Sequence, residues 1–353
     1  MPARNPGAAS VALRQYNDGL SQAARVRKAA AGMALGLGLG RFVGGRVDVF
    51  PGADSSSLPL LSNELRLVFG DRRMEIAVFL GERDRPNRKP ILQVMTEQGE
   101  VLGYVKVGWN GVTKRLVANE ADALRSLAAS PPETFRVPRL LHEGGVGDHH
   151  VTVLSPFRHR LLRRGELGAP PPGAALREVA FRQGTETRAL AGSEYARMVR
   201  DRLADVADVG RRDLLAEAFD GIESVAGEVA MIFGSCHGDW TPWNMTRARS
   251  GLIVWDWERS AQPVPVGLDV LHHRFQFAWR GGRVPVERAI SAARRESGDM
   301  LSWLGVAEPN HELLLRLYLL ELILRFEEGR GDGASLRPSA DLEVALREGM
   351  APA

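Results

Sequence analysis

Hydrophobic and polar positions along the chain predict a β-rich part followed by a helical part. Between about residues 63 and 107, short apolar runs alternate with turn-like segments such as GDRR and EQGE. These runs are ELRLVF, EIAVFLG, PILQVMTE and VLGYVKVGW. Two further strands are expected around RVPRLLHEG and HHVTVLSPF. Together the runs predict an antiparallel sheet that ends near residue 156.

Residues 112–129 predict a helix that carries a charged residue on its apolar face. Leu116, Leu124 and Leu127 share one face at helical spacing. Glu120 lies midway along the same stripe. Because a carboxylate is costly to bury alone, we expect it to have a cationic partner. The alternative for Glu120, taken by itself, is a solvated helix face.

The second part of the chain is predicted to be mainly helical. Apolar positions have helical spacing over 193–206 and 211–230, and the pattern is again helical from 281 onward. Before these helices, residues 163–185 contain three consecutive prolines and several glycines, which predicts a linker or irregular segment. The expected fold class is therefore α+β, with an antiparallel β N-lobe and a mainly helical C-lobe.

Three segments are expected along the chain. Residues 1–44 are interpreted as an N-terminal extension, with one helix around 12–30 and a glycine-rich run at 29–40. That run is shorter than a membrane span, so we interpret it as a packing or docking segment, with peripheral membrane contact as the lesser alternative. The β-rich lobe is placed at 45–156 and the helical lobe at 157–353.

Composition narrows the classes of protein to consider. Hydrophobic residues make up 44% and charged residues 25% of the chain, as in an ordinary globular protein. The 46 basic and 43 acidic side chains are spread along the sequence, so nucleic-acid binding is not expected. Cys236 is the single cysteine, which excludes an internal disulfide and favours a cytoplasmic location. The most hydrophobic stretch, at 313–326, is interrupted by charges and predicts a buried helix rather than a transmembrane one.

The stretch CHGDWTPWNM, residues 236–245, is followed by a turn signal, ARSG, and a strand, LIVWDW. This order predicts a β-hairpin with its turn near residue 250. Antiparallel pairing would then place Asn244 opposite Asp256 at the open end. Asp239 lies in the loop that leads into that end. Two carboxylates and a carboxamide are therefore expected to converge.

Grouped oxygen ligands of this kind suit Mg²⁺, which prefers one or two protein oxygens together with water and substrate phosphates. If Asn244 and Asp256 hold the metal, Asp239 is left to handle a proton, and phosphoryl transfer is the reaction class that uses all three groups. In the alternative interpretation, Asp239 and Asn244 only stabilise a turn. A zinc site is not expected, because the cysteine and histidines of this region lack metal-ligand spacing.

HGDWTPWN followed by VWDWE resembles the His-Gly-Asp-x4-Asn catalytic loop and metal-binding aspartate of the aminoglycoside phosphotransferase and choline kinase-like family. That family is related to protein kinases, so the resemblance implies a two-lobed protein-kinase-like fold with ATP and Mg²⁺ as cofactors. It also implies that Asp239 is the catalytic base and that Asn244 and Asp256 are magnesium ligands. Lys106 in GYVKV resembles the strand lysine that contacts ATP phosphates, and Glu120 in NEADAL resembles the glutamate that pairs with it.

The resemblance implies further positions around the nucleotide. The segment LSPF would join the lobes, with the carbonyl of Ser155 and the N–H of Phe157 contacting adenine. Asp269 in PVGLDVLHH resembles a buried aspartate that braces the catalytic loop. One departure is that GERDRPNRK, at 81–89, lacks the glycine-rich phosphate loop of protein kinases.

We therefore predict an ATP-dependent kinase that phosphorylates a hydroxyl group of a small molecule. Beyond residue 260 acidic residues barely outnumber basic ones, so a sugar or other weakly charged metabolite is preferred over a polycationic antibiotic as acceptor. The alternative is a catalytically weak or inactive kinase-like module that docks on a partner or a membrane surface through residues 1–44. Protein-serine kinase activity is a third, less favoured possibility.

Overall fold

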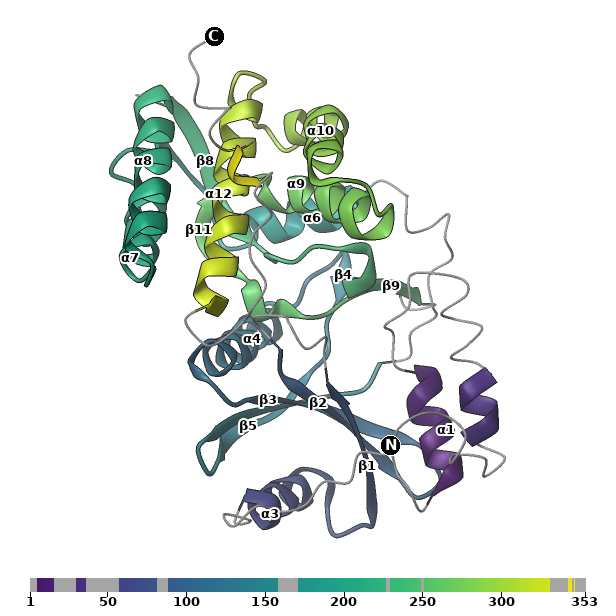
Figure 1. Cartoon of the computed structure of the whole chain (residues 1–353). Helices are drawn as coiled ribbons and strands as arrows, with labels where there is room; N and C mark the ends of the chain where they lie inside the picture. The colour runs from purple at the N-terminus through teal and green to yellow at the C-terminus, as the bar shows by residue number, and fades with distance from the viewer. Residues whose placement is uncertain are drawn as a thin grey trace. The chain divides into compact units, whose positions relative to one another are not determined.

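The computed structural model describes residues 5–15, 30–35, 57–80, 88–157, 171–226, 229–248, 251–330, 342–344 and 346. The chain divides into two compact units (Figure 1). The first unit comprises Met1–Arg83, Arg88–Ala129 and Val137–Leu161, and the second comprises Asp84–Asn87, Ser130–Arg136 and Leu162–Ala353.

The first unit contains a five-stranded antiparallel sheet with strand order β1-β2-β3-β6-β5 (Figure 1). Its strands are β1 (Met74–Leu80), β2 (Pro90–Thr96), β3 (Val101–Gly108), β5 (Leu140–Val146) and β6 (His149–Leu154). The antiparallel sheet predicted from short apolar runs between turn-like segments is confirmed, with one exception described below.

One face of this sheet carries Lys106. The pairs Ile91↔Lys106 and Phe79↔Ile91 place these three side chains on the same face. Helix α4 (Gly111–Ala129) covers this face over β3 and β6. Helix α1 (Pro6–Gln15) covers the same face near β1 and β2, where Ala8 and Ala12 pack with Phe79. The N-terminal residues 5–15 are thus part of the core of the first unit.

The other face of the sheet is covered by α3 (Ser57–Phe69), and here a sequence prediction is wrong. ELRLVF, predicted as a strand, forms the end of this helix. Within that short window polar and apolar residues alternate, as in a strand. The helical period appears only over a longer stretch, in which Leu61, Leu65 and Val68 all face the core of the sheet.

The second unit is mainly helical. Its helices are α6 (Gly173–Phe181), α7 (Glu194–Ala204), α8 (Val209–Ala226), α9 (Leu268–Gln276), α10 (Val286–Glu296), α11 (Gly298–Trp303) and α12 (Asn310–Arg330). Two three-stranded sheets accompany them, with orders β11-β8-β7 and β4-β10-β9. The strands are β4 (Phe135–Arg136), β7 (Glu186–Ala189), β8 (Ala230–Cys236), β9 (Met245–Ala248), β10 (Gly251–Val254) and β11 (Ala261–Pro265).

Two predictions for this unit are corrected. The segment 163–185 is not wholly a linker, because Gly173–Phe181 form α6 with Leu176 and Val179 buried on one side. Prolines before a helix are compatible with its start, so the proline run did not exclude a helix after it. The predicted helix 211–230 ends at Ala226, and Ala230 already begins β8.

Helix α12 is buried along most of its length, as predicted for the hydrophobic stretch at 313–326. Its buried acidic residue Glu321 accepts hydrogen bonds from Tyr195 at 3.1 Å and from the guanidinium of Arg202 at 2.8 and 2.9 Å. These partners offset the cost of burying the charge and hold α7 against α12. Among the helices that the structure describes, none is both long and apolar enough to cross a membrane.

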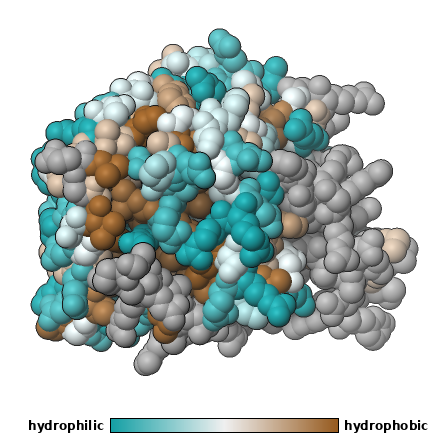
Figure 2. Space-filling model, turned by 90° about the horizontal axis from the view of Figure 1, so that it is seen from above, coloured by the Kyte–Doolittle hydropathy of each residue, from teal (hydrophilic) through white to brown (hydrophobic). Residues whose placement is uncertain are grey.

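The surface of the molecule mixes apolar and polar residues. Figure 2 shows brown, hydrophobic areas bordered by teal, hydrophilic ones on the face in view. In the second unit, Val209, Val225 and Trp303 are large apolar side chains that are at least half exposed. Arg177 lies over the Trp303 ring at 5.7 Å, so part of this surface is already engaged within the unit.

Candidate active site

The predicted hairpin is present in the second unit. Strands β9 and β10 pair antiparallel, and Val254 lies opposite Met245. The residue opposite Asn244 is therefore Trp255, whose N–H donates to the Asn244 carbonyl at 3.0 Å. The pairing predicted between Asn244 and Asp256 is wrong by one residue, because the turn lies slightly earlier than assumed. Asn244 itself ends a short 3₁₀ turn, Pro242–Asn244.

The loop that precedes the hairpin is braced from α9. The carboxylate of Asp269 accepts the backbone N–H of His237 at 2.7 Å and that of Gly238 at 2.9 Å. Asp269 is in the first turn of α9, which also favours a negative charge. These bonds match the bracing position that the family resemblance implies for Asp269.

His237 also holds the loop through the backbone. Its Nδ1 accepts the N–H of Asp239 at 3.1 Å, and its Nε2 donates to the carbonyl of Trp255 at 3.0 Å. A single proton on Nε2 satisfies both bonds. The ring packs edge-on against Trp257, with centroids 4.5 Å apart. The imidazole therefore links the loop at Asp239 to the residue that follows β10.

Asp239 lies at the end of this loop between two donors. Its Oδ2 accepts the side-chain N–H of Asn244 at 2.9 Å, and its Oδ1 lies 2.8 Å from His272 Nε2. Desolvation acts to raise the pKa of Asp239, but the hydrogen bond to His272 and nearby positive charges, including Arg325, hold that pKa well below its usual range. The side chain is 31% exposed, so a substrate hydroxyl can reach an ionised carboxylate.

Asn244, which contacts Asp239, and Asp256, which follows the end of β10, carry side-chain oxygens that could bind a metal. The side-chain nitrogen of Asn244 donates a hydrogen bond to Asp239, so its side-chain oxygen is the atom that could bind a metal. Asp256 follows Trp255 in the chain and has a left-handed backbone, with φ 70° and ψ 52°. A non-glycine residue in this region is strained, and such strain gathers at functional sites. The two oxygen-bearing side chains fit the hard ligands that Mg²⁺ prefers.

Gly238 is required where the loop passes another segment. Its φ is +81°, and a Cβ would lie 2.0 Å from the carbonyl oxygen of Arg259. The Gly238 carbonyl in turn accepts a hydrogen bond from Arg325 Nη1 at 2.6 Å. The loop backbone at Gly238 is thus contacted by both Arg259 and Arg325.

We expect Gly238→Ala to destabilise the second unit by about 2–5 kcal/mol, from the left-handed backbone and the clash together. Thermal or urea unfolding measures this loss. Gly251→Ala is a matched control, because Gly251 also has a positive φ, +108°, but nothing lies within 4 Å of its Cβ position. This control should lose only about 1–2 kcal/mol. If both variants lose the same unfolding free energy, the clash between a Cβ at residue 238 and the Arg259 carbonyl does not contribute to the loss.

The first unit contains a buried ion pair on the Lys106 face of its sheet. Lys106 Nζ lies 2.8 and 2.6 Å from the two carboxylate oxygens of Glu120. The side chains are 9% and 1% exposed. The cationic partner expected for Glu120 is therefore Lys106, which β3 and α4 bring together.

The segment after β6 is tied to the start of β5. Ser155 donates its N–H to the carbonyl of Arg139 at 2.8 Å, and its Oγ accepts the N–H of Arg139 at 2.9 Å. The Phe157 ring lies 6.4 Å from the ring of Tyr104, centroid to centroid. Sequence reasoning missed Tyr104, although the alternation in GYVKV places it on the same strand face as Lys106. Burial raises the pKa of Tyr104 to about 12, so its hydroxyl stays protonated.

Comparisons with known proteins identify the fold. No protein-family model and no curated protein matches the sequence. Among solved structures, the chain is similar to a thermostable mutant of aminoglycoside phosphotransferase APH(4)-Ia, with TM-score 0.53, 14% identity and coverage of 82% of this chain and 97% of that chain. It is also similar to choline kinase LicA from Streptococcus pneumoniae, with TM-score 0.53, 12% identity and coverage of 83% and 98%. A complex of LicA with AMP matches with TM-score 0.51, 12% identity and coverage of 82% and 96%.

The chain has a protein-kinase-like fold. The predicted α+β class is confirmed, as is the resemblance of this fold to small-molecule kinases. The candidate residues of the kinase-like fold fall into two groups. Lys106, Glu120, Ser155 and Phe157 belong to the first unit, and the others belong to the second.

Of the segment GERDRPNRK between β1 and β2, residues 81–87 lie outside the described residues. Residues 16–29, 36–56 and 158–170 also lie outside the described residues, and they include most of the predicted extension and about the first third of the predicted linker.

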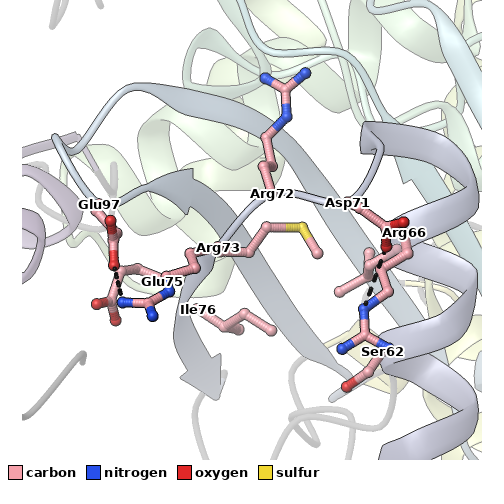
Figure 3. A pocket seen from close by; sticks show the side chains of 10 residues that line it. Ser62, Arg66, Asp71, Arg72, Arg73, Glu75, Ile76 and Glu97 are labelled. Atoms are coloured by element: carbon pink, nitrogen blue, oxygen red, sulfur yellow. Dashed lines mark ion pairs between the residues drawn. The ribbon is translucent and has the colours of Figure 1, made fainter.

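A pocket of about 560 Å³ lies beside β1 and α3 in the first unit (Figure 3). Its charged lining consists of Arg66, Arg72, Arg73, Asp71, Glu75 and Glu97. Arg66 lies 3.9 Å from Asp71, and Arg73 lies 3.6 Å from Glu97. Because the basic and acidic groups balance, the pocket favours neither an anion nor a cation, and we assign it no part in the chemistry.

Proposed function

We propose that this protein is a kinase that transfers the γ-phosphate of ATP to a hydroxyl group of a small molecule, with Mg²⁺ as the metal. The observation that carries this proposal is the arrangement around Asp239. An ionised, partly exposed carboxylate is held by Asn244 at the mouth of a hairpin that continues into Asp256. Such a group can accept the hydrogen bond of an incoming hydroxyl and take up its proton.

Each residue has a role in the proposed reaction. Asp239 orients the acceptor hydroxyl and receives its proton as the O–P bond forms. Since the transition state of phosphoryl transfer is loose, orientation and charge stabilisation matter more than strong basicity, which agrees with the lowered pKa of Asp239. Asn244 and Asp256 would hold Mg²⁺, which neutralises phosphate charge when it is bound.

The first unit would bind the nucleotide. The Lys106 ammonium, held by Glu120, is a compact positive charge suited to phosphate oxygens. The rings of Tyr104 and Phe157 lie near each other at the end of β3 that adjoins the Ser155 segment. We propose that they flank the base, with the backbone of Ser155 and Phe157 contacting its edge. Stacking on aromatic faces is a common way to bind a nucleobase.

The acceptor is proposed to be a sugar or another weakly charged hydroxyl compound. The positive charge of Arg325 is felt at Asp239, which disfavours a polycationic acceptor at the same place. The structural neighbours with aminoglycoside or choline in their names indicate hydroxyl acceptors as a class for this fold. Cytoplasmic location remains a proposal that rests on sequence composition.

The test is ATP-dependent phosphorylation of a panel of sugars, amino sugars, choline and nucleosides. Transfer of ³²P from labelled ATP to each compound is the readout. We expect transfer to at least one hydroxyl compound. Removing the metal with EDTA should lower turnover at least about 100-fold, because the metal supplies several kcal/mol of charge stabilisation. Added Mg²⁺ should restore the rate. Magnesium-dependent nucleotide binding without transfer would favour an inactive kinase-like module, and ³²P in peptides alone would favour a protein kinase.

A further inference from the structure

His272 contacts the proposed catalytic carboxylate but has no role in the function proposed so far. It lies on α9, one turn after the loop-bracing Asp269, and its side chain is 5% exposed. Its Nε2 is 2.8 Å from Asp239 Oδ1. Because Asp239 is ionised, the close contact requires a proton on His272 Nε2.

Tyr318 on α12 determines where that proton resides. Its hydroxyl lies 3.2 Å from His272 Nδ1, and the two rings meet edge-on with centroids 5.8 Å apart. Burial keeps the Tyr318 hydroxyl protonated by raising its pKa, so it has a proton to donate. With the His272 proton on Nε2, Nδ1 offers a lone pair that accepts the Tyr318 proton. A neutral imidazole with its proton on Nε2 is the state that satisfies both neighbours.

The consequence for Asp239 is a fixed carboxylate plane. His272 holds one oxygen and Asn244 holds the other, from two different elements of the second unit. Rotation of the carboxylate would break both hydrogen bonds. The remaining lone pairs of Asp239 are thus held in one direction. The rate of a catalysed reaction depends strongly on placing the reacting group to within a few tenths of an ångström.

We propose that His272, with its tautomer set by Tyr318, is a positioning residue that aims the Asp239 carboxylate at the acceptor hydroxyl. This inference rests on the proposed kinase function. It assigns His272 no proton transfer and no contact with substrate. His272 and Tyr318 act on Asp239 as residues that hydrogen-bond to a metal ligand act on that ligand, by setting its orientation.

The experiment compares His272→Leu, His272→Gln and Tyr318→Phe in the full-length protein over a range of MgATP concentrations up to saturation. The readouts are ³²P transfer to the acceptor found in the panel and slow ATP hydrolysis by water. His272→Leu should lower kcat about 10- to 100-fold, as loss of an outer partner does, with the KM for ATP unchanged within about twofold. His272→Gln places an amide N–H near the former Nε2 and should recover most of that loss. Tyr318→Phe should lower kcat about 3- to 10-fold, because only the tautomer preference is lost.

His273→Gln is the matched control. His273 is the neighbouring histidine on α9, is also buried, and has no hydrogen-bond partner at its Nδ1 among the described residues. It should keep the kcat of the wild type, whereas a general disturbance of α9 would lower all the histidine variants alike. Long-range ¹H–¹⁵N spectra of the imidazoles give a second readout. They should show His272 as the Nε2–H tautomer, and Tyr318→Phe should produce a tautomer mixture.

A double variant with His272→Leu and Asp239→Asn tests the positioning role of His272 separately from the kinase function. If His272 acts through Asp239, adding His272→Leu to Asp239→Asn should cost no further activity. A full additional loss in the double variant, or wild-type kcat in His272→Leu, would overturn the positioning role and leave the kinase function intact. Activity insensitive to Asp239→Asn, or absent from the wild type, would overturn both.

Discussion

Asp239→Asn should lower kcat for phosphate transfer by about 100- to 10,000-fold, the usual effect of losing a general base. The substitution keeps the size of the side chain but removes its charge. It also leaves one oxygen to face two donors, so either His272 Nε2 or Asn244 Nδ2 meets an N–H₂ group instead of an acceptor. Nucleotide binding should change little, because the phosphates are assigned to Lys106 and the metal.

The measurement is kcat with the best acceptor from the panel, together with the Kd of MgATP by calorimetry. Asp213→Asn is a control in the same unit, because the Asp213 side chain is 71% exposed on α8. It should keep the wild-type rate. A thermal melt of Asp239→Asn checks that the catalytic loop still folds. If the variant melts normally and retains its rate, the assignment of the base is wrong.

Glu120→Leu should destabilise the first unit by roughly 3–5 kcal/mol, because it leaves Lys106 buried without its carboxylate. The double variant Lys106→Met with Glu120→Leu should return to within about 1 kcal/mol of the wild type, since two apolar groups of similar volume need no ion pair. The double variant should nevertheless turn over ATP far more slowly, because the phosphates lose the Lys106 ammonium. The expected result is therefore a double variant that is nearly as stable as the wild type but far less active.

Hydrogen exchange of the β3 and α4 amides measures the local stability of these variants better than a global melt, because the chain has two units. Asp122→Ala provides the control on the same helix. Asp122 lies 2.6 Å from Arg125, and both side chains are at least half exposed, so this change should cost at most about 1 kcal/mol. A double variant as unstable as Glu120→Leu alone would show that the ion pair is not the source of the loss.

The sequence determined the parts of this protein that depend on local pattern. Short apolar runs separated by turn signals predicted β1, β2, β3 and β6, because strands of a sheet covered on both faces are largely apolar. The turn signal between two apolar runs predicted the hairpin of β9 and β10, with an error of one residue in its register. A charged residue on an apolar helix face predicted a cationic partner for Glu120, since an unpaired charge would be too costly there.

Other features depend on residues that are distant in the sequence. Whether 57–69 form a helix or end in a strand was decided by packing of Leu61, Leu65 and Val68 on the sheet. The short window ELRLVF carries both periods, so local pattern could not decide between them. Residues 173–181 form a helix despite the preceding prolines, because their apolar side is buried in the second unit.

The surroundings of Asp239 were decided by tertiary structure alone. Sequence reasoning placed Asp239 and Asn244 near each other because they lie five positions apart in one loop. His272 and Tyr318 lie on α9 and α12, far along the chain, and only the packing of these helices brings them to the loop. Histidine and tyrosine carry no spacing signal for such a contact, whereas a hairpin or a helix face does. Local periodicity therefore predicts elements and nearby pairs, while the orientation of a reactive group depends on long-range packing that the pattern does not encode.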